Sequence, residues 1–419
     1  MSVSPGRILG IALGSVAILA VGVYGPAMLL GPLPDVTVRV AEPAGDTAPA
    51  STPITLPADG QSAFAVVADD GTSDIIATAG EQVAMPMGGA AKLVTLLVTL
   101  DGLPLEQGLD GPDIRIGAED YTDYLRYDAE GSRVLQVSPG DTWTERDVLR
   151  AVLLASSNNH ADTLARWAFG SVDQYVTEAN AWLEQEGFAS TRVADATGLS
   201  GDNVGTASEL TELAARVLAE PTLGELLANG DDAPTAAGAK RIPDVIGHLE
   251  SDGIRAITRS YTDQGGLGFV FTTVLPASGD APAHRLIGAM LGQPDYETLD
   301  PAVLAAVASA TASAAPVEVI AAGSSYGTVE SAWGERARLV AAASRTDASW
   351  GATAGAASVD VDRFTTAPDG RTVGTVTVEV GEREVSSALQ LDGAIRDPGP
   401  IWRLTNPATL IEAFLDGQA

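Results

Sequence analysis

The chain has 419 residues, 45% of them hydrophobic, and carries 24 basic against 55 acidic side chains, giving a formal net charge of −31. This length accommodates two or three domains of roughly 100–200 residues, and the apolar fraction is too high for a disordered chain. The acidity argues against nucleic-acid binding, because phosphates are bound by clustered Lys and Arg. The absence of cysteine excludes disulfides and thiolate catalysis, and the three histidines lack zinc-ligand spacing. We therefore expect neither a metal nor a cofactor.

The N-terminal residues 8–30 form an apolar run without charge, preceded by Arg7. A membrane-spanning helix needs about 20 apolar residues, whereas the apolar region of a signal peptide usually has about 7–15. We therefore expect a membrane anchor within residues 1–34, with a cleaved signal peptide as the alternative. Arg7 before the run and acidic residues after it favour an extracytoplasmic location for the bulk of the chain. Residues 35–58 are rich in Pro, Ala, Thr and acids, which predicts an extended linker.

Residues 59–315 mix strand and helix patterns. Alternating or continuous apolar runs bounded by turn residues predict strands at 63–68, 74–79, 269–275 and 285–291. Leucines at helical spacing, capping residues and terminal Gly or Pro predict helices that start near Gly89, after Thr144, after Thr206 and at Pro301, and one that ends at Gly187. A hairpin, a block of helices and returning strands indicate an α+β domain.

The last third of the chain changes character. Between residues 316 and 400, short strand-like runs such as TVTVEV alternate valine with polar residues, which predicts a small all-β domain. Residues 401–419 predict a C-terminal tail helix, with Asn406 as its cap and Pro407 at its first position. Neither segment contains a catalytic pattern, so we expect a spacer or a protein-contact surface.

Four segments of the α+β domain follow one another in a familiar order. They read PMGGAAKLVTLLV, VSPGDTWTERDVLRAVLLASSNNHADTLA, VADATGLSGDNVGTASELTELAARVL and DGIRAITRSYTDQGGLGFVF. The set resembles the penicillin-binding serine D-Ala-D-Ala carboxypeptidases, the low-molecular-mass penicillin-binding proteins, with their Ser-x-x-Lys, Ser-x-Asn and Lys-Thr-Gly motifs. The resemblance implies a β-lactamase/transpeptidase-like fold, with helices packed on an antiparallel sheet, followed by a small β domain. It also implies a serine nucleophile activated by lysine, a substrate-binding Ser-x-Asn motif and a carboxylate-binding Lys-Thr-Gly strand.

The nucleophile is missing from the first motif. Lys92 occupies the lysine position, but three residues before it lies Gly89, which has no hydroxyl and cannot form an acyl-enzyme. The only other lysine, Lys240, follows Ala237 at the same spacing, so no Ser-x-x-Lys exists elsewhere. Lys92 is therefore either a surviving base or an ordinary solvated or snorkelling side chain in the first turn of a helix.

Of the other two motifs, only Ser156-Ser157-Asn158 keeps its pattern, while Lys-Thr-Gly is replaced by Thr258-Arg259-Ser260 or, in another alignment, by Arg255-Ala256-Ile257. Ser156 and Asn158 either hydrogen-bond a ligand or satisfy backbone groups where their helix ends. Arg255 or Arg259 either holds a carboxylate or is a solvated strand-edge residue. His160, next to the second motif, is either a base or a packed or surface residue.

These observations predict a membrane-anchored, extracytoplasmic homologue of the D-Ala-D-Ala carboxypeptidases that has lost its chemistry. Its expected role is binding or scaffolding in the cell wall, with the peptidoglycan stem peptide or cell-wall proteins as partners. One alternative is an active serine-type peptidase with a non-standard nucleophile. Another is a structural ectodomain without a ligand in the former cleft.

Overall fold

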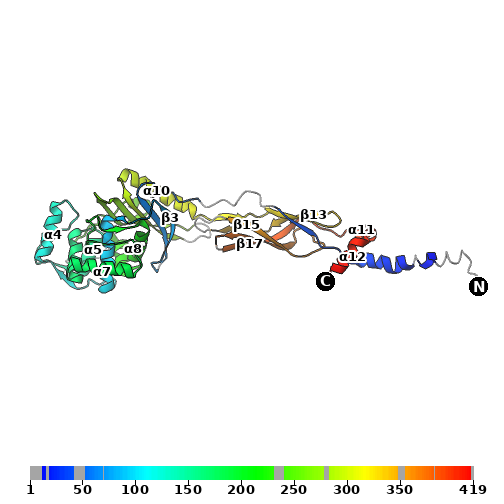
Figure 1. Cartoon of the computed structure of the whole chain (residues 1–419), viewed down its shortest axis with the longest axis horizontal. Helices are drawn as coiled ribbons and strands as arrows, with labels where there is room; N and C mark the ends of the chain where they lie inside the picture. Colours follow the sequence, from blue (N-terminus) through cyan, green and yellow to red (C-terminus); the bar gives the residue numbers. More distant parts are fainter. Residues whose placement is uncertain are drawn as a thin grey trace, which may run out of the picture. The chain divides into compact units, whose positions relative to one another are not determined.

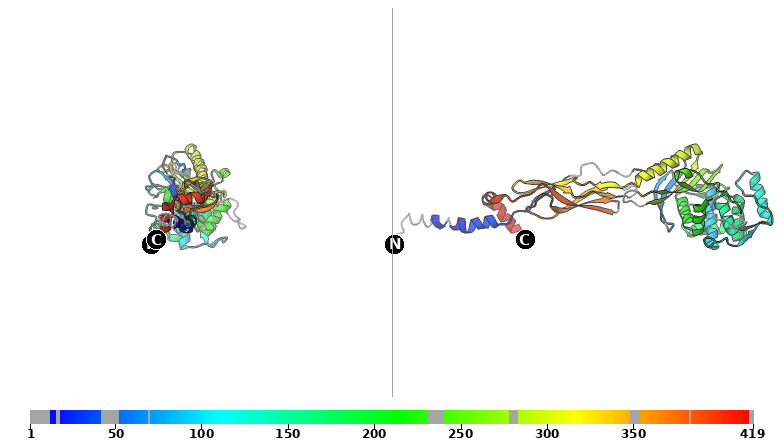
Figure 2. Two further views of the ribbon diagram at one scale, coloured as in Figure 1. Left: turned by 90° about the vertical axis from the view of Figure 1, so that its right-hand side faces the viewer. Right: turned by 180° about the vertical axis from the view of Figure 1, so that it is seen from behind.

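The computed structural model describes residues 12–15, 18–41, 52–68, 70–230, 240–277, 283–347, 354–381 and 383–416. The chain folds into two compact units (Figures 1 and 2). One unit runs from Thr52 to Ala314, and the other combines Met1–Ser51 with Ala315–Ala419.

The unit Thr52–Ala314 contains a five-stranded antiparallel sheet in the order β3-β2-β10-β9-β8. Its strands are β2 (Gln61–Val67), β3 (Ser73–Ala79), β8 (Ile254–Thr262), β9 (Gly266–Leu275) and β10 (His284–Gln293). The predicted strands of this unit are thereby confirmed. β2, β9 and β10 are apolar and almost wholly buried, whereas β8 forms an edge of the sheet.

Helices form the rest of this unit. They are α3 (Ala91–Gly102), α4 (Ala118–Ala129), α5 (Glu145–Leu153), α6 (Asn158–Phe169), α7 (Val172–Gln185), α8 (Ala207–Ala219), α9 (Pro221–Asn229) and α10 (Tyr296–Ser313). A 3-10 turn, η2 (Gly88–Ala90), leads into α3, which is buried from Ala91 to Leu100. Further short elements are β4 (Met85–Pro86), β5 (Asp113–Arg115), β6 (Thr142–Thr144), β7 (Val204–Gly205) and η4 (Glu250–Asp252).

Capping residues explain where α5, α8 and α10 begin. The starts of α5 and α8 agree with the prediction, and the start of α10 does not. Thr144 and Thr206 each accept the backbone N–H three residues on, at 3.1 Å, and start α5 and α8 as expected. The helix predicted from Pro301 instead begins at Tyr296, because the Asp295 carboxylate accepts the Thr298 N–H at 2.8 Å and caps it earlier. Pro301 therefore lies inside α10, and that prediction of the helix start was wrong.

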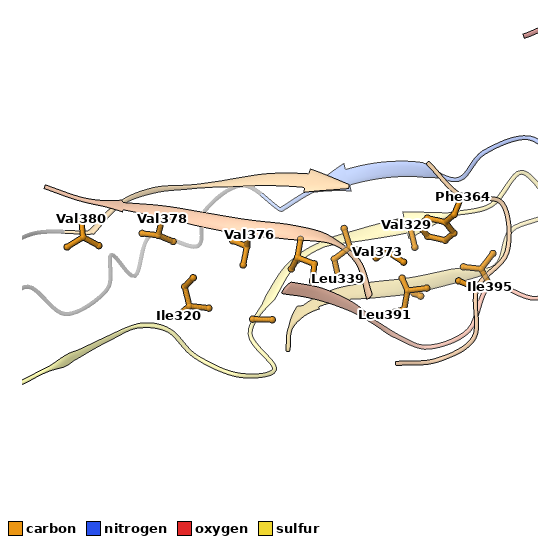
Figure 3. Close-up of a cluster of buried hydrophobic side chains, with 14 residues drawn as sticks. Ile320, Val329, Leu339, Phe364, Val373, Val376, Val378, Val380, Leu391 and Ile395 are labelled. Carbon is orange, nitrogen blue, oxygen red and sulfur yellow. The ribbon is translucent and has the colours of Figure 1, made fainter. Parts of the chain in front are cut away.

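The other unit is built on a six-stranded antiparallel sheet in the order β1-β12-β13-β17-β16-β15. Its strands are β1 (Thr37–Val40), β12 (Ser325–Glu330), β13 (Arg336–Ala341), β15 (Ala354–Val361), β16 (Thr372–Val380) and β17 (Arg383–Asp392), and β11 (Val317–Ile320) pairs separately with β14 (Arg345–Asp347). Inward valines of β16 alternate with polar residues, as predicted, and build the core with Leu339 and Leu391 (Figure 3). β1 lies within the segment predicted to be an extended linker, so that prediction was wrong for Thr37–Val40. Val36, Val38 and Val40 alternate with polar residues, and backbone pairing with β12 orders them as an edge strand. Residues 42–51 of that linker lie outside the described residues.

The C-terminal segment forms two helices, α11 (Gly399–Thr405) and α12 (Pro407–Asp416), instead of the single predicted one. Asn406 breaks them at φ −123° and ψ 57°, because the ring of the following Pro407 disfavours helical backbone at the residue before it. α11 packs against α2 (Gly25–Leu30), which follows η1 (Ala20–Tyr24), and Leu410 of α12 contacts the cluster that contains Met28 (Figures 1 and 2).

The predicted anchor, residues 8–30, is described only in part, since residues 8–11, 16 and 17 lie outside the described residues. Across the described ranges, no helix combines the length and the apolar character needed to cross a membrane.

Candidate functional site

Position 89 has no room for a side chain. Gly89 lies in η2, and its backbone N–H donates to Ser260 Oγ on the edge strand β8 at 2.9 Å. A Cβ atom added to Gly89 would lie 2.9 Å from Ser260 Cβ and 3.2 Å from Ser260 Oγ. The Ser260 side chain therefore fills the space that a residue 89 side chain would need.

Lys92, one turn further along, is buried and makes two hydrogen bonds. Its Nζ donates to Asn158 Oδ1 at 2.7 Å and to the Thr197 carbonyl oxygen at 2.5 Å. Burial lowers the pKa of this amine to about 8, and the nearby Asp195 carboxylate opposes the shift. The amine thus links α3 to α6 and to the loop after Asp195, and its burial contradicts the interpretation of Lys92 as a solvated or snorkelling side chain.

The Ser-x-Asn segment meets Lys92 through the side chain of Asn158. Asn158 begins α6 and turns its side chain to the lysine, while its backbone N–H donates to the Arg133 carbonyl at 2.9 Å. Ser156 precedes the helix in a left-handed conformation, with φ at 48°. Its Oγ lies 3.7 Å from the Cβ position of residue 89, and no described residue hydrogen-bonds it.

The space between these residues is nearly closed. A void of about 10 Å³ lies between them and the core, lined by Gly89, Lys92, Ser156 and Thr258 and by the buried side chains of Leu93, Leu96, Val152, Leu153 and Ile257. That volume approaches the minimum that a single water molecule requires, roughly 10–15 Å³. No peptide fits into it without movement of the surrounding side chains.

The neighbouring edge of the sheet is also engaged. Arg133 Nη1 donates to the Arg259 carbonyl oxygen on β8 at 2.6 Å. An extended peptide that added to this edge would have to displace the guanidinium, because edge carbonyls are the groups that such a peptide pairs with.

The two arginines proposed as carboxylate ligands lie elsewhere. Arg255 pairs with Asp244 at 2.6 Å and donates to the Leu227 carbonyl at 2.9 Å. Arg259 donates to the Val245 carbonyl at 2.8 Å, and its guanidinium lies 5.6 Å from the Tyr296 ring centre. The structure therefore brings together Gly89, Lys92, Ser156 and Asn158 but neither arginine side chain.

His160 is a packed residue. It is fully buried, its ring lies 4.2 Å from that of Trp143, and its Nδ1 is 2.9 Å from Ser157 Oγ. Burial lowers the pKa of this histidine to about 3. Ser157 is fully buried as well, so this serine–histidine pair cannot be reached from solvent.

Sequence reasoning missed the two residues that close the site, Ser260 and Arg133. The signal for Ser260 was present, because one alignment places it at the glycine of Lys-Thr-Gly, where any side chain would project toward residue 89. Nothing in the sequence singled out Arg133. Within the described ranges, no group of three or more His, Asp or Glu side chains is placed to hold a metal ion.

The model of the D-alanyl-D-alanine carboxypeptidase family, peptidase S11, matches residues 50–274. The chain belongs to this family. A D-alanyl-D-alanine endopeptidase of Escherichia coli is 30% identical over 177 residues, covering 42% of this chain and 53% of the relative. A D-alanyl-D-alanine carboxypeptidase of Mycobacterium tuberculosis is 30% identical over 173 residues, covering 41% of this chain and 55% of the relative. The chain thus spans about half the length of these curated relatives.

Solved structures of S11-like proteins share the fold. Penicillin-binding protein 6B of Escherichia coli has a TM-score of 0.54 at 15% identity, covering 84% of this chain and 98% of that one. Penicillin-binding protein 5 of Haemophilus influenzae has a TM-score of 0.53 at 16% identity, covering 82% of this chain and all of that one. The predicted penicillin-binding α+β fold and the family resemblance are confirmed.

Proposed function

We propose that this S11 family member is catalytically inactive and serves as a scaffold in the cell wall. The observation that carries the proposal is the pairing of Gly89 with Ser260. The acyl-enzyme route needs a hydroxyl at position 89, and the Ser260 side chain occupies the space for it. Removing the nucleophile of a serine hydrolase leaves only the small residual rate supplied by binding groups.

The proposal includes a tether through residues 8–30, with the bulk of the chain on the extracytoplasmic side. The length of the apolar run and Arg7 before it support this arrangement. Peptidoglycan, on which the family acts, lies on that side of the membrane.

The proposal favours cell-wall proteins over the stem peptide as partners. The Ser260 side chain beside position 89 and the guanidinium of Arg133 on the edge strand both stand in the way of a stem peptide at this site. A scaffold would bind its protein partners through surfaces outside the site around Gly89, so its function would not require an open cleft.

Fluorescent penicillin tests the loss of chemistry. The full chain in detergent micelles is incubated with the label and run on a denaturing gel beside an active enzyme of the family. We expect a covalent band for the active enzyme alone. A covalent band on this chain would refute the proposal, and release of D-alanine that is lost in Ser156→Ala would establish a non-standard nucleophile.

A melting experiment separates a scaffold from a stem-peptide binder. A ligand present at about 100 times its Kd stabilises the protein by about 2.7 kcal/mol. We expect no change in Tm with a peptide ending in D-Ala-D-Ala, and the same peptide ending in L-Ala-L-Ala is the control. A rise in Tm with the D-form alone would assign stem-peptide binding to this chain.

A further inference from the structure

A cavity of about 690 Å³ lies between the helices α8 and α9 and one end of the five-stranded sheet. Apolar residues of both layers line it, among them Val67 on β2, Leu218 on α8 and Leu227 on α9. Pockets that bind small molecules commonly measure about 300–1,000 Å³, so this cavity is large enough for one. It reaches β8 at Arg255, five positions before Ser260 and thus roughly 16 Å along the strand from the site described above.

Small residues on the two helices leave this space open. Ala215 and Ala219 lie one turn apart on α8, and Gly224 and Ala228 lie one turn apart on α9. All four line the cavity, and larger side chains at these positions would occupy it. The Glu220 carboxylate accepts the Leu223 N–H at 2.6 Å and starts α9 directly after α8, so both small faces belong to one tight helical hairpin.

The charges of the cavity are opposite to that of the chain. The charged side chains among its described lining residues are two arginines, Arg255 and Arg285, in a protein with a net charge of −31. Arg255 already pairs with Asp244 at 2.6 Å and with Glu250 at 3.3 Å. Arg285 is exposed, and no acidic side chain in the described part of the chain pairs with it. Its positive charge can therefore pair with an external anion.

The pairing of the strands directs Arg285 to the cavity. Arg285 on β10 lies opposite Val67 on β2 and Val274 on β9. Residues directly opposite each other in a sheet carry their side chains on the same face, and both valines line the cavity. Val67 is buried, whereas Val274 is 55% exposed. The Arg285 side chain therefore leaves the sheet on the cavity side, at the boundary between the buried wall and solvent.

The other polar side chains of the wall are already hydrogen-bonded. Thr272 Oγ1 donates to the Leu286 carbonyl at 2.8 Å, and Thr273 Oγ1 donates to the Gly253 carbonyl at 3.0 Å. A ligand rich in hydroxyl or amide groups, such as a sugar or a peptide, would bury these groups against an apolar wall without partners, which is unfavourable. The wall therefore favours a ligand that is apolar apart from one anionic group.

We propose that this cavity binds a small carboxylic acid with an apolar body. The carboxylate pairs with Arg285 at the mouth of the cavity, because a guanidinium binds a carboxylate through two parallel hydrogen bonds. The apolar body lies against the small residues of α8 and α9. One guanidinium balances the single charge of a carboxylate, whereas a phosphate monoester carries nearly two charges into an acidic protein. The site shares no residue with the Gly89 site, so it does not depend on the proposed function.

Photoaffinity labelling of the full chain in detergent micelles tests this site. The probe is 4-benzoylbenzoate, whose benzophenone is the apolar body, and its uncharged methyl ester is the control probe at the same free concentration. Peptide mass spectrometry locates the attached probe after irradiation. Arg285→Met removes the charge and keeps an apolar stem, and Ala228→Trp fills the cavity from an exposed position of α9. Arg115→Met, at an exposed position of β5 outside the cavity, is the matched control.

We expect the acid to label the walls of the cavity on α8, α9 or β9. The ester should label them about tenfold less, because it lacks the charge-assisted hydrogen bonds to the guanidinium. Arg285→Met should lower labelling by the acid to the level of the ester, and Ala228→Trp should remove labelling of the cavity by both probes. Arg115→Met should leave the labelling unchanged.

Several results would overturn the proposal. Absence of labelling, or labelling confined to other parts of the chain, would exclude the site. Equal labelling of the cavity by acid and ester would show a cavity for neutral apolar molecules. Stronger competition by 1-naphthyl phosphate than by 1-naphthoate would show a preference for phosphate. The comparison of acid and ester uses the natural chain, so it remains decisive even where a substitution disturbs the fold.

Discussion

Gly89→Ala measures how strongly the Ser260 side chain opposes any side chain at position 89. The backbone of Gly89 is not in the left-handed region, so alanine is allowed there by conformation alone. The obstacle is Ser260 Cβ, only 2.9 Å from the added atom and fixed to the β8 backbone. Overpacking of this kind typically costs about 1–3 kcal/mol. A domain of 150–250 residues loses about 2–4 °C in Tm per kcal/mol, so we expect a loss of several degrees.

A second substitution locates the cause of that loss. Ser260→Gly removes the clashing atom, at a cost of about 0.5–1.5 kcal/mol for the hydrogen bond to the Gly89 N–H. In this background Gly89→Ala should be neutral or stabilising, because alanine is favoured over glycine in a helical turn by about 0.5–1 kcal/mol. The coupling between the two positions should therefore fall within about 0.5–3 kcal/mol, the range for residues in contact.

The assay is urea unfolding of the four proteins of this cycle, followed by far-UV circular dichroism. Gly102→Ala is the control for glycine replacement, because no other group lies within 4 Å of a Cβ added there. Ser260→Ala is the control for the hydroxyl, since it keeps Cβ, and Gly89→Ala should remain costly beside it. If Gly89→Ala costs the same in the natural chain, in the Ser260→Ala background and in the Ser260→Gly background, the reasoning is refuted.

Three further outcomes are expected. Folding lowers the pKa of Lys92 from 10.5 to about 8, so the free energy of unfolding should fall by at most about 3 kcal/mol as the pH drops from about 10.5 to about 8, and Lys92→Met should remove this dependence in pH-resolved urea titrations. Thr206→Ala removes the cap of α8 and should cost about 0.5–2 kcal/mol in the same assay, whereas Thr311→Ala, on an exposed face of α10, should change little. Leu339→Ala opens a cavity in the core shown in Figure 3 and should lower the free energy of unfolding by about 2–5 kcal/mol. In calorimetry, only the unfolding transition of the unit that contains the six-stranded sheet should shift. A shift of the Thr52–Ala314 transition as well would contradict separate cores.

The features predicted most accurately from the sequence were helix starts, which depend on residues within one or two turns of the chain. The start near Gly89 followed from leucine spacing, and the starts of α5 and α8 from Thr144 and Thr206. These features rest on periodicity and caps within one or two turns. The helix start predicted at Pro301 was also based on a local signal, but it was wrong. The side chain of Asp295 caps α10 five residues before the position predicted from Pro301.

The two contacts that close the site could not be predicted from short stretches of sequence. The contact of Gly89 with Ser260 spans 171 positions, and that of Arg133 with Arg259 spans 126. Their geometry depends on how η2 and the Arg133 loop pack against β8, and no periodicity within one segment encodes that. Gly89 and Ser260 were each visible in the sequence at a motif position, whereas the contact between them required coordinates.

The pairing of β1 with β12 constrains the order in which this protein can mature. Thr37 lies opposite Glu330, so the edge of the β sheet needs two segments separated by the whole Thr52–Ala314 unit. Contacts between distant segments form late, because a long loop must close before they are made. The intervening unit has its own core, so it should fold during synthesis and shorten that loop. β1 would then remain unpaired until β12 has been synthesised.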